Sequence, residues 1–125
     1  MNTINLGAFC ISLAVKDIHA SKAFYEKLGF TETGGNIDQN WLVLRNEDKV
    51  IGLFQGMFEK NMLTFNPGWN QQAQSVDPFT DIRDIAKTLS AYGLQLNETP
   101  KGDSGPAYIT LTDPDGNPVL IDQHR

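Results

Sequence analysis

The sequence predicts an α+β fold made of two copies of one βαβββ unit, and three observations predict it. First, residues 17–29 and 81–93 each begin with Asp, continue as a helix-compatible run and end with Gly, 64 positions apart. Second, segments with alternating apolar residues surround both runs. Third, a turn-forming segment precedes the last strand in each half. We therefore expect two like halves of one domain with a cleft between them.

In the first half, Ile11, Leu13 and Val15 alternate with smaller residues, which indicates a strand over 8–15. A helix follows Asp17, and the four-residue spacing of Ala20, Phe24 and Leu28 predicts its buried face. Three further strands are expected, at 29–35, 40–45 and 49–55.

The second half predicts the same order of elements. The helix has Ile82, Ile85 and Leu89 on its buried face, and residues 113–117, Asp-Pro-Asp-Gly-Asn, form a turn. The strands are expected at 72–77, 94–98, 106–112 and 118–123. Residues 57–70, which include Phe65 and Trp69, are interpreted either as a lid over a ligand site or as a plug at the edge of the core.

The chain of 125 residues suits a single domain over 1–125, with 1–56 as the first unit, 57–70 as an aromatic linker or lid and 71–125 as the second unit. Apolar residues at 40% and charged residues at 20% are typical of a globular protein. The formal net charge of −5 argues against a nucleic-acid partner. No segment has the length and apolarity of a membrane span or a signal peptide, and Cys10 is the single cysteine, so we expect a cytoplasmic protein.

Several short motifs together resemble one known family. They are Val15-Lys16-Asp17, Phe24-Tyr25, Leu28-Gly29-Phe30 and the turn at 113–117. With the repeated unit, they look like the vicinal oxygen chelate superfamily, the group of glyoxalases, bleomycin-resistance proteins and extradiol dioxygenases. The resemblance covers nearly the whole chain. It implies that the two βαβββ units form a curved mixed sheet, a cup with the helices on its outside and a metal inside, and that the protein is a homodimer.

The resemblance also implies where metal ligands would fall. The family places one seven residues before each helix-capping Asp and another seven residues after the Asp that opens the Asp-Pro-Asp-Gly-Asn turn. In this chain those positions are Cys10, Gly52, Gln74 and Leu120, where the family usually has His or Gln, Glu, His and Glu. Gly52 and Leu120 have no donor atom, so we expect no metal and no other cofactor.

Two alternatives stay open for these residues. Cys10, Gln74, Asp122 and His124 could form a substitute zinc set. Cys10 could instead be a nucleophile, but no nearby cation or helix N-terminus is visible to lower its pKa, which favours a small buried residue.

Strand parity separates a helix-facing apolar set from a mixed set that would line the cup. An aromatic wall with a few polar groups is typical of a small-molecule site. The predicted ligand-binding residues are Cys10, Ser12, Trp41, Phe54, Trp69, Gln74, Tyr108, Thr110 and Asp122, and Asp122 is expected to favour a cationic ligand. Catalytic residues are not identified.

The leading hypothesis is therefore a metal-free, small-molecule-binding or resistance-type protein of this superfamily. The competing hypothesis is a metal-dependent lyase of the lactoylglutathione lyase type, or a dioxygenase, with a non-standard ligand set.

Overall fold

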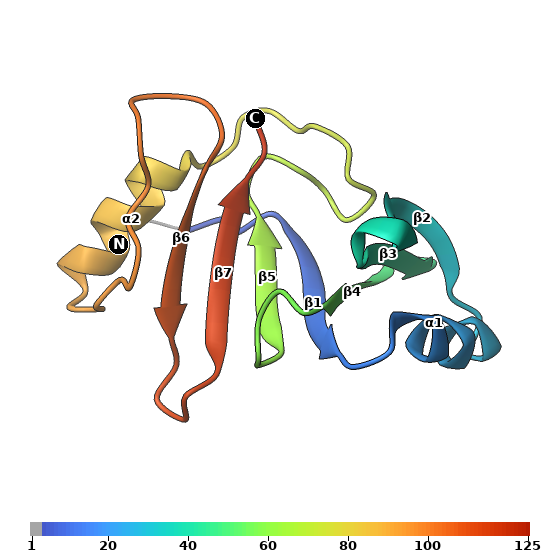
Figure 1. The fold of residues 1–125 in the computed structure, drawn as a ribbon. Helices are drawn as coiled ribbons and strands as arrows, with labels where there is room; N and C mark the ends of the chain where they lie inside the picture. The colour runs from blue at the N-terminus through green and yellow to red at the C-terminus, as the bar shows by residue number, and fades with distance from the viewer. Residues whose placement is uncertain (1–3) are drawn as a thin grey trace. The chain divides into compact units, whose positions relative to one another are not determined.

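A computed structural model of the chain describes residues 4–125 (Figure 1). The chain divides into two compact units. One comprises residues 10–62, and the other combines residues up to Phe9 with residues 63–125. The division falls inside the first strand, β1 (Ala8–Val15). Ala8 and Phe9 belong to the unit that contains residues 63–125, and the rest of β1 belongs to the unit of residues 10–62.

The unit of residues 10–62 has the predicted βαβββ order. After β1 come α1 (Ile18–Lys27), β2 (Thr31–Asn36), a short 3₁₀ helix η1 (Ile37–Gln39), β3 (Trp41–Asn46) and β4 (Lys49–Gln55). The strands are ordered β2-β3-β4-β1, with β1 parallel to β4 and the other neighbours antiparallel. The buried core joins α1 to the inner face of β3 and β4 through Ile18, Leu42, Leu44, Ile51 and Leu53.

The other unit repeats this pattern with fewer strands. It contains β5 (Met62–Asn66), α2 (Ile82–Ala91), β6 (Ala107–Thr112) and β7 (Pro118–Gln123), in the sheet order β5-β7-β6. Here β5 is parallel to β7, as β1 is parallel to β4. Its core joins α2 to β6 and β7 through Ile82, Ile85, Ala86, Ile109 and Ile121. The expected helix face of Ile82, Ile85 and Leu89 is confirmed.

Both helices start in the way that the sequence predicts. The Asp17 side chain accepts hydrogen bonds from the backbone N–H groups of His19 and Ala20, and Asp81 accepts one from Arg83. Gly29 and Gly93, just after the helices, have φ angles of 97° and 86°, in the left-handed region that favours glycine.

A glutamine from the last strand of each unit completes the helix start. The backbone N–H of Ile18 donates to Oε1 of Gln55 at 2.9 Å, and that of Ile82 donates to Oε1 of Gln123 at 2.7 Å. Each amide thus satisfies a helix N–H group that lacks a partner inside the helix.

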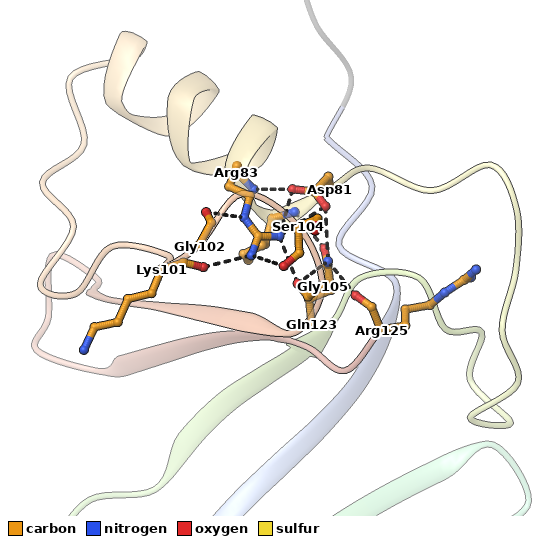
Figure 2. Close-up of polar contacts among 9 residues, drawn as sticks. Asp81, Arg83, Lys101, Gly102, Ser104, Gly105, Gln123 and Arg125 are labelled. Atoms are coloured by element: carbon orange, nitrogen blue, oxygen red, sulfur yellow. Dashed lines mark hydrogen bonds and ion pairs between the residues drawn. The ribbon is translucent and has the colours of Figure 1, made fainter.

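Around Gln123 the network is larger (Figure 2). The Gln123 amide nitrogen donates to the Asp81 carboxylate and to the carbonyls of Gly105 and Arg125. The Arg83 guanidinium pairs with Asp81 and donates to four carbonyls of the loop before β6, those of Lys101, Gly102, Ser104 and Gly105. These contacts hold that loop against the start of α2.

The predicted strand at 72–77 is wrong. The strand that enters the second unit is β5, within the segment expected to be a linker or lid, and its register pairs Thr64 with Leu120 as Ser12 pairs with Gly52. The first strands of the two copies, β1 and β5, are thus offset by 52 residues, whereas the helices are offset by 64. The difference is an insertion between β5 and α2, which an alignment anchored on the helices does not reveal.

Two other expectations also need correction. Phe24 and Leu28 of α1 are 58% and 57% exposed, so they are not core anchors. Ile18 and Tyr25 pack on the core instead, and Tyr25 lies one residue, about 100°, around the helix from Phe24. The strand expected at 94–98 is reduced to an isolated bridge between Glu98 and Thr110.

Among the described residues, no helix has the length and apolar character that a membrane span requires.

Candidate functional site

The predicted cup residues fall into two sets, one in each unit. In the unit of residues 10–62, the core residues of β3 and β4 point toward α1, so the alternate residues lie on the opposite face. There Trp41 is paired with Phe54, and Val43 with Gly52. Cys10 and Ser12 of β1 belong to the same face, since Ser12 is paired with Gly52. We call this surface the aromatic face.

Phe54 covers the position where the family usually has a carboxylate. A Cβ atom placed on Gly52 would lie 2.6 Å from Cε2 and 3.2 Å from Cζ of the Phe54 ring. Real Cβ atoms are not found that close to another heavy atom, so any side chain at position 52 requires the ring to move. Position 52 therefore has no donor atom, and the Phe54 ring also occupies the space that a ligating side chain would need.

Three aromatic rings adjoin one another on this face. The Trp41 and Phe54 rings are nearly parallel, at 10°, with centroids 6.4 Å apart. The Phe58 ring lies 5.3 Å from Phe54 at 47°. Offset stacked and tilted pairs at these distances are favourable, and they create a continuous apolar surface against which a flat molecule can pack.

Cys10 does not have the environment of a nucleophile. Burial raises the pKa of the Cys10 thiol to about 11, which outweighs the hydrogen bond from Ser12, the backbone contact with Gly52 and the distant charge of Arg45. The thiol also lies 3.5 Å from the carbonyl oxygen of Ile11. The interpretation of Cys10 as a small, unreactive residue agrees with these contacts.

In the other unit, the predicted residues Tyr108, Thr110 and Asp122 share one face of β6 and β7. Tyr108 is paired with Asp122, and Thr110 with Leu120. The hydroxyl of Tyr108 donates to Oε2 of Glu98 at 2.7 Å, and that of Thr110 donates to Oε1 at 3.3 Å. Glu98 is therefore the polar partner of both hydroxyls.

The side chain of Asp122 contacts His124. Oδ2 of Asp122 lies 3.3 Å from Nε2 of His124, and the His124 ring stacks on the indole of Trp69 at 8°, with centroids 4.6 Å apart. The interaction with Asp122 raises the pKa of His124, and partial burial opposes it. We call Trp69, His124 and Asp122 the indole–imidazole–carboxylate set.

Gln74 does not occupy the position expected for it. It is exposed in the loop between β5 and α2, where its side-chain oxygen accepts a hydrogen bond from Asn70 at 3.1 Å. The strand pairing makes Thr64 of β5 the equivalent of Ser12 of β1. Met62, two residues before Thr64, is therefore the equivalent of Cys10, two residues before Ser12. A thioether is a poor ligand for a hard divalent cation.

The residues at the family's metal positions therefore do not fit a divalent metal. In the corrected register they are Cys10, Gly52, Met62 and Leu120, without a carboxylate or an imidazole. Within residues 4–125, no three His, Cys, Asp or Glu side chains gather as a metal-binding group. The substitute zinc set of Cys10, Gln74, Asp122 and His124 therefore does not assemble as a metal site. Asp122 and His124 are the one pair of that set that the structure brings into contact.

The model of the Glyoxalase/Bleomycin resistance protein/Dioxygenase superfamily matches residues 7–121. The chain belongs to this superfamily. The resemblance inferred from the short motifs is thus confirmed. No curated protein matches the sequence significantly.

Solved structures show that the fold is the superfamily's. A glyoxalase/bleomycin resistance protein/dioxygenase superfamily member from Vibrio splendidus 12B01 is 17% identical, with a TM-score of 0.64, over 92% of this chain and 97% of that one. A Legionella pneumophila structure named NAD-dependent benzaldehyde dehydrogenase is 15% identical, with a TM-score of 0.69, over 94% of this chain and 99% of that one. At such identities the likeness concerns the fold and carries no activity.

Sequence reasoning missed three participants. Phe58 lies just past β4 in the segment interpreted as a linker, and its place beside Phe54 carries no sequence signal. Glu98 was placed on a strand, yet its role as acceptor for two hydroxyls depends on the irregular path of the chain before β6. His124 was considered only as a member of the substitute zinc set, and its stacking on Trp69 was missed. Its two-residue spacing from Asp122 was the available signal for their contact.

Proposed function

We propose that this superfamily member binds a planar organic molecule without the help of a bound divalent metal. The observation that carries the proposal is the Phe54 ring above Gly52, 2.6 Å from where a Cβ atom would be. A site that places an aromatic ring where the family has a carboxylate favours contact with apolar, flat ligand surface over metal coordination.

The neighbouring rings support the same ligand chemistry. Trp41 and Phe58 both adjoin the Phe54 ring, and a further aromatic ring could add to this group in the same stacked or tilted geometry. Ser12 and the Cys10 thiol lie on the same face as small polar groups. A resistance-type role, in which the protein sequesters an aromatic compound, is one form of this proposal.

Two further parts of the proposal rest on the family resemblance and on composition. We expect a homodimer, which equilibrium sedimentation would detect, and a cytoplasmic location, which fractionation of the native host would test.

The chain offers a clean optical test, because it has two tryptophans, Trp41 and Trp69. In a Trp69→Phe variant, all tryptophan emission comes from Trp41 on the aromatic face. Planar aromatic compounds should shift this emission saturably, and Phe54→Leu should weaken their binding about tenfold or more, because a ring contact is lost. Leu111→Ile, on the helix-facing side of β6, is the matched control and should bind as the parent does.

The metal part of the proposal has its own test. Protein purified without chelators should contain well below one equivalent of divalent metal per chain in elemental analysis. One equivalent of zinc, manganese, nickel or iron would contradict the proposal. Gly52→Glu with Leu120→Glu and Cys10→His should create metal affinity only when Phe54→Ala is added, since the ring must be removed to admit a side chain at position 52.

A further inference from the structure

The indole–imidazole–carboxylate set is a candidate binding element distinct from the aromatic face. Its members come from two segments of one unit. Trp69 belongs to the loop after β5, Asp122 belongs to β7, and His124 directly follows β7. Tyr108 is the cross-strand partner of Asp122, so the set continues onto the face of β6 that points away from α2.

The set has unused hydrogen-bonding capacity. His124 uses Nε2 toward Oδ2 of Asp122. Among residues 4–125, no hydrogen bond is formed by Nδ1 of His124 or by Oδ1 of Asp122. Neutral imidazole that directs Nε2–H at Asp122 carries a lone pair on Nδ1, so both unused atoms are acceptors.

The charges of the surrounding elements favour a cation at these acceptors. From β6, Tyr108 faces Asp122, and the Tyr108 hydroxyl is bonded to the carboxylate of Glu98. From β5, Asn66 donates to the main-chain oxygen of Asp122 and adds no charge. The charged groups of the loop that carries Trp69 are neutralised locally, since Asp77 pairs with Arg125 and the Arg125 guanidinium lies 4.5 Å above the ring of Phe79.

We infer that Trp69, His124 and Asp122 form a binding site for a flat organic cation with N–H donors, such as an amidinium or guanidinium, and that protonation of His124 releases this ligand. The N–H groups of such a cation donate to the carboxylate of Asp122 and to Nδ1 of His124. The indole of Trp69, which already stacks with the imidazole, favours positive charge near its ring.

Protonation acts against binding in two ways. The imidazolium repels a ligand cation, and it forms a full ion pair with the carboxylate that the ligand needs. Because the hydrogen bond and charge of Asp122 raise the pKa of His124, protonation of His124 begins at a higher pH than for an ordinary histidine.

The test uses the Trp41→Phe variant, in which Trp69 is the one tryptophan, and three probes of the same shape: benzamidine, benzamide and benzoate. At about pH 8.5, benzamidine should change Trp69 emission saturably, neutral benzamide should bind about tenfold more weakly or worse, and benzoate should not bind. Equal binding of benzamidine and benzamide would overturn the cation preference.

Matched variants separate the roles of the residues. Asp122→Asn should lower benzamidine affinity about tenfold, whereas Glu98→Gln, whose carboxylate is already occupied by two hydroxyls, should lower it much less. His124→Gln should retain binding and abolish the loss of affinity between about pH 8.5 and pH 5.5. A loss of affinity that persists in the folded His124→Gln variant would overturn the role of His124, and circular dichroism would verify folding.

This inference and the proposed function are tested independently. Benzamidine binding is reported by Trp69 in Trp41→Phe, and planar aromatic binding at the aromatic face is reported by Trp41 in Trp69→Phe. Failure of one reporter to respond leaves the result from the other reporter intact.

Discussion

At the scale of single residues, the chemistry of the candidate sites depends on what lies beside each side chain. Cys10 illustrates this, because the same thiol in an exposed position would be an ordinary nucleophile. Here it is partly buried beside Gly52 and Ser12, and this burial raises the pKa of the thiol to about 11. Thiolate is the reactive form, so burial protects Cys10 from both alkylation and oxidation.

We therefore predict slow modification of Cys10 by iodoacetamide. At about pH 8, the shift of its pKa from 9.0 to about 11 lowers the thiolate fraction roughly 100-fold, and the alkylation rate should fall in proportion. Mass spectrometry against time measures this rate, with the protein in denaturant as the control. Equal rates in the native and unfolded protein would show that Cys10 is accessible and ionised.

The sequence predicts the chemistry of a position only where the residue type alone determines it. The absence of donors at Gly52 and Leu120 was visible from residue type alone, and the register confirms that these two positions are equivalent. The Phe54 ring above Gly52 was not visible, because it depends on the side-chain conformation of Phe54, which no pattern of residue types specifies. The contact between Trp69 and His124 joins segments more than fifty residues apart, a pairing for which the sequence has no local signal.

At the scale of elements, helix position was predictable and helix rotation was not. The Asp caps and the terminal glycines determine where α1 and α2 begin and end, and both were predicted within a residue or two. The buried face of α1 was wrong because Ala20, Phe24 and Leu28 have the correct helical spacing but lie on the exposed side. The spacing of apolar residues shows which of them share one side of a helix. It does not show which side packs on the sheet.

Truncations in α1 should therefore have unequal effects. Ile18→Ala should destabilise the protein by about 2–5 kcal/mol, because Ile18 is fully buried in the core of its unit. Phe24→Ala should cost less than about 1 kcal/mol, since 58% of Phe24 is exposed. Urea unfolding measures both, and an equal loss of stability would mean that Phe24 is buried in solution.

The paired glutamines at the helix starts give a second prediction at this scale. Gln55→Ala and Gln123→Ala each leave a helix N–H without its acceptor and should cost about 1–3 kcal/mol. Glutamate keeps the acceptor, so Gln55→Glu should be tolerated. Gln123→Glu should be damaging, because it loses three donor contacts and places a second charge beside Asp81. Similar melting temperatures for the two glutamate variants would contradict this assignment.

The strand β5 was also within reach of the sequence. Leu63, Thr64 and Phe65 alternate in the way that a half-buried strand does, and Leu63 and Phe65 are paired with the core positions Val119 and Ile121. Anchoring the repeat on its helices concealed this alternation, because the insertion before α2 lengthens the second copy. Short insertions between well-marked elements are the ordinary reason why repeat alignments fail.

At the scale of the whole molecule, two units share one strand. Ala8 and Phe9 belong to one unit and the rest of β1 to the other, and the Phe9 backbone is held by the Gln71 side chain through hydrogen bonds of 2.8 and 2.6 Å. Unfolding of either unit must therefore disturb the strand that the other one uses.

We expect the two units to unfold together. Trp41 reports the unit of residues 10–62 and Trp69 reports the other, so thermal melts of Trp69→Phe and Trp41→Phe follow each unit separately. Each midpoint should agree with that found for the same variant by circular dichroism, which reports both units together. Two steps in the circular dichroism of the wild type, or a tryptophan transition that departs from it, would contradict cooperative unfolding.

The division of β1 also bears on how this chain could have been assembled and how it can be dissected. The unit of residues 10–62 is one continuous stretch, but the other takes the segment before Cys10 from the opposite end of the chain. A fragment that starts at Leu63 lacks Phe9, whose ring lies 5.3 Å from Phe65, and lacks the backbone that Gln71 binds. Neither cutting nor recombination at residue 62 therefore yields two whole units, and exchange of a unit between relatives must carry both pieces.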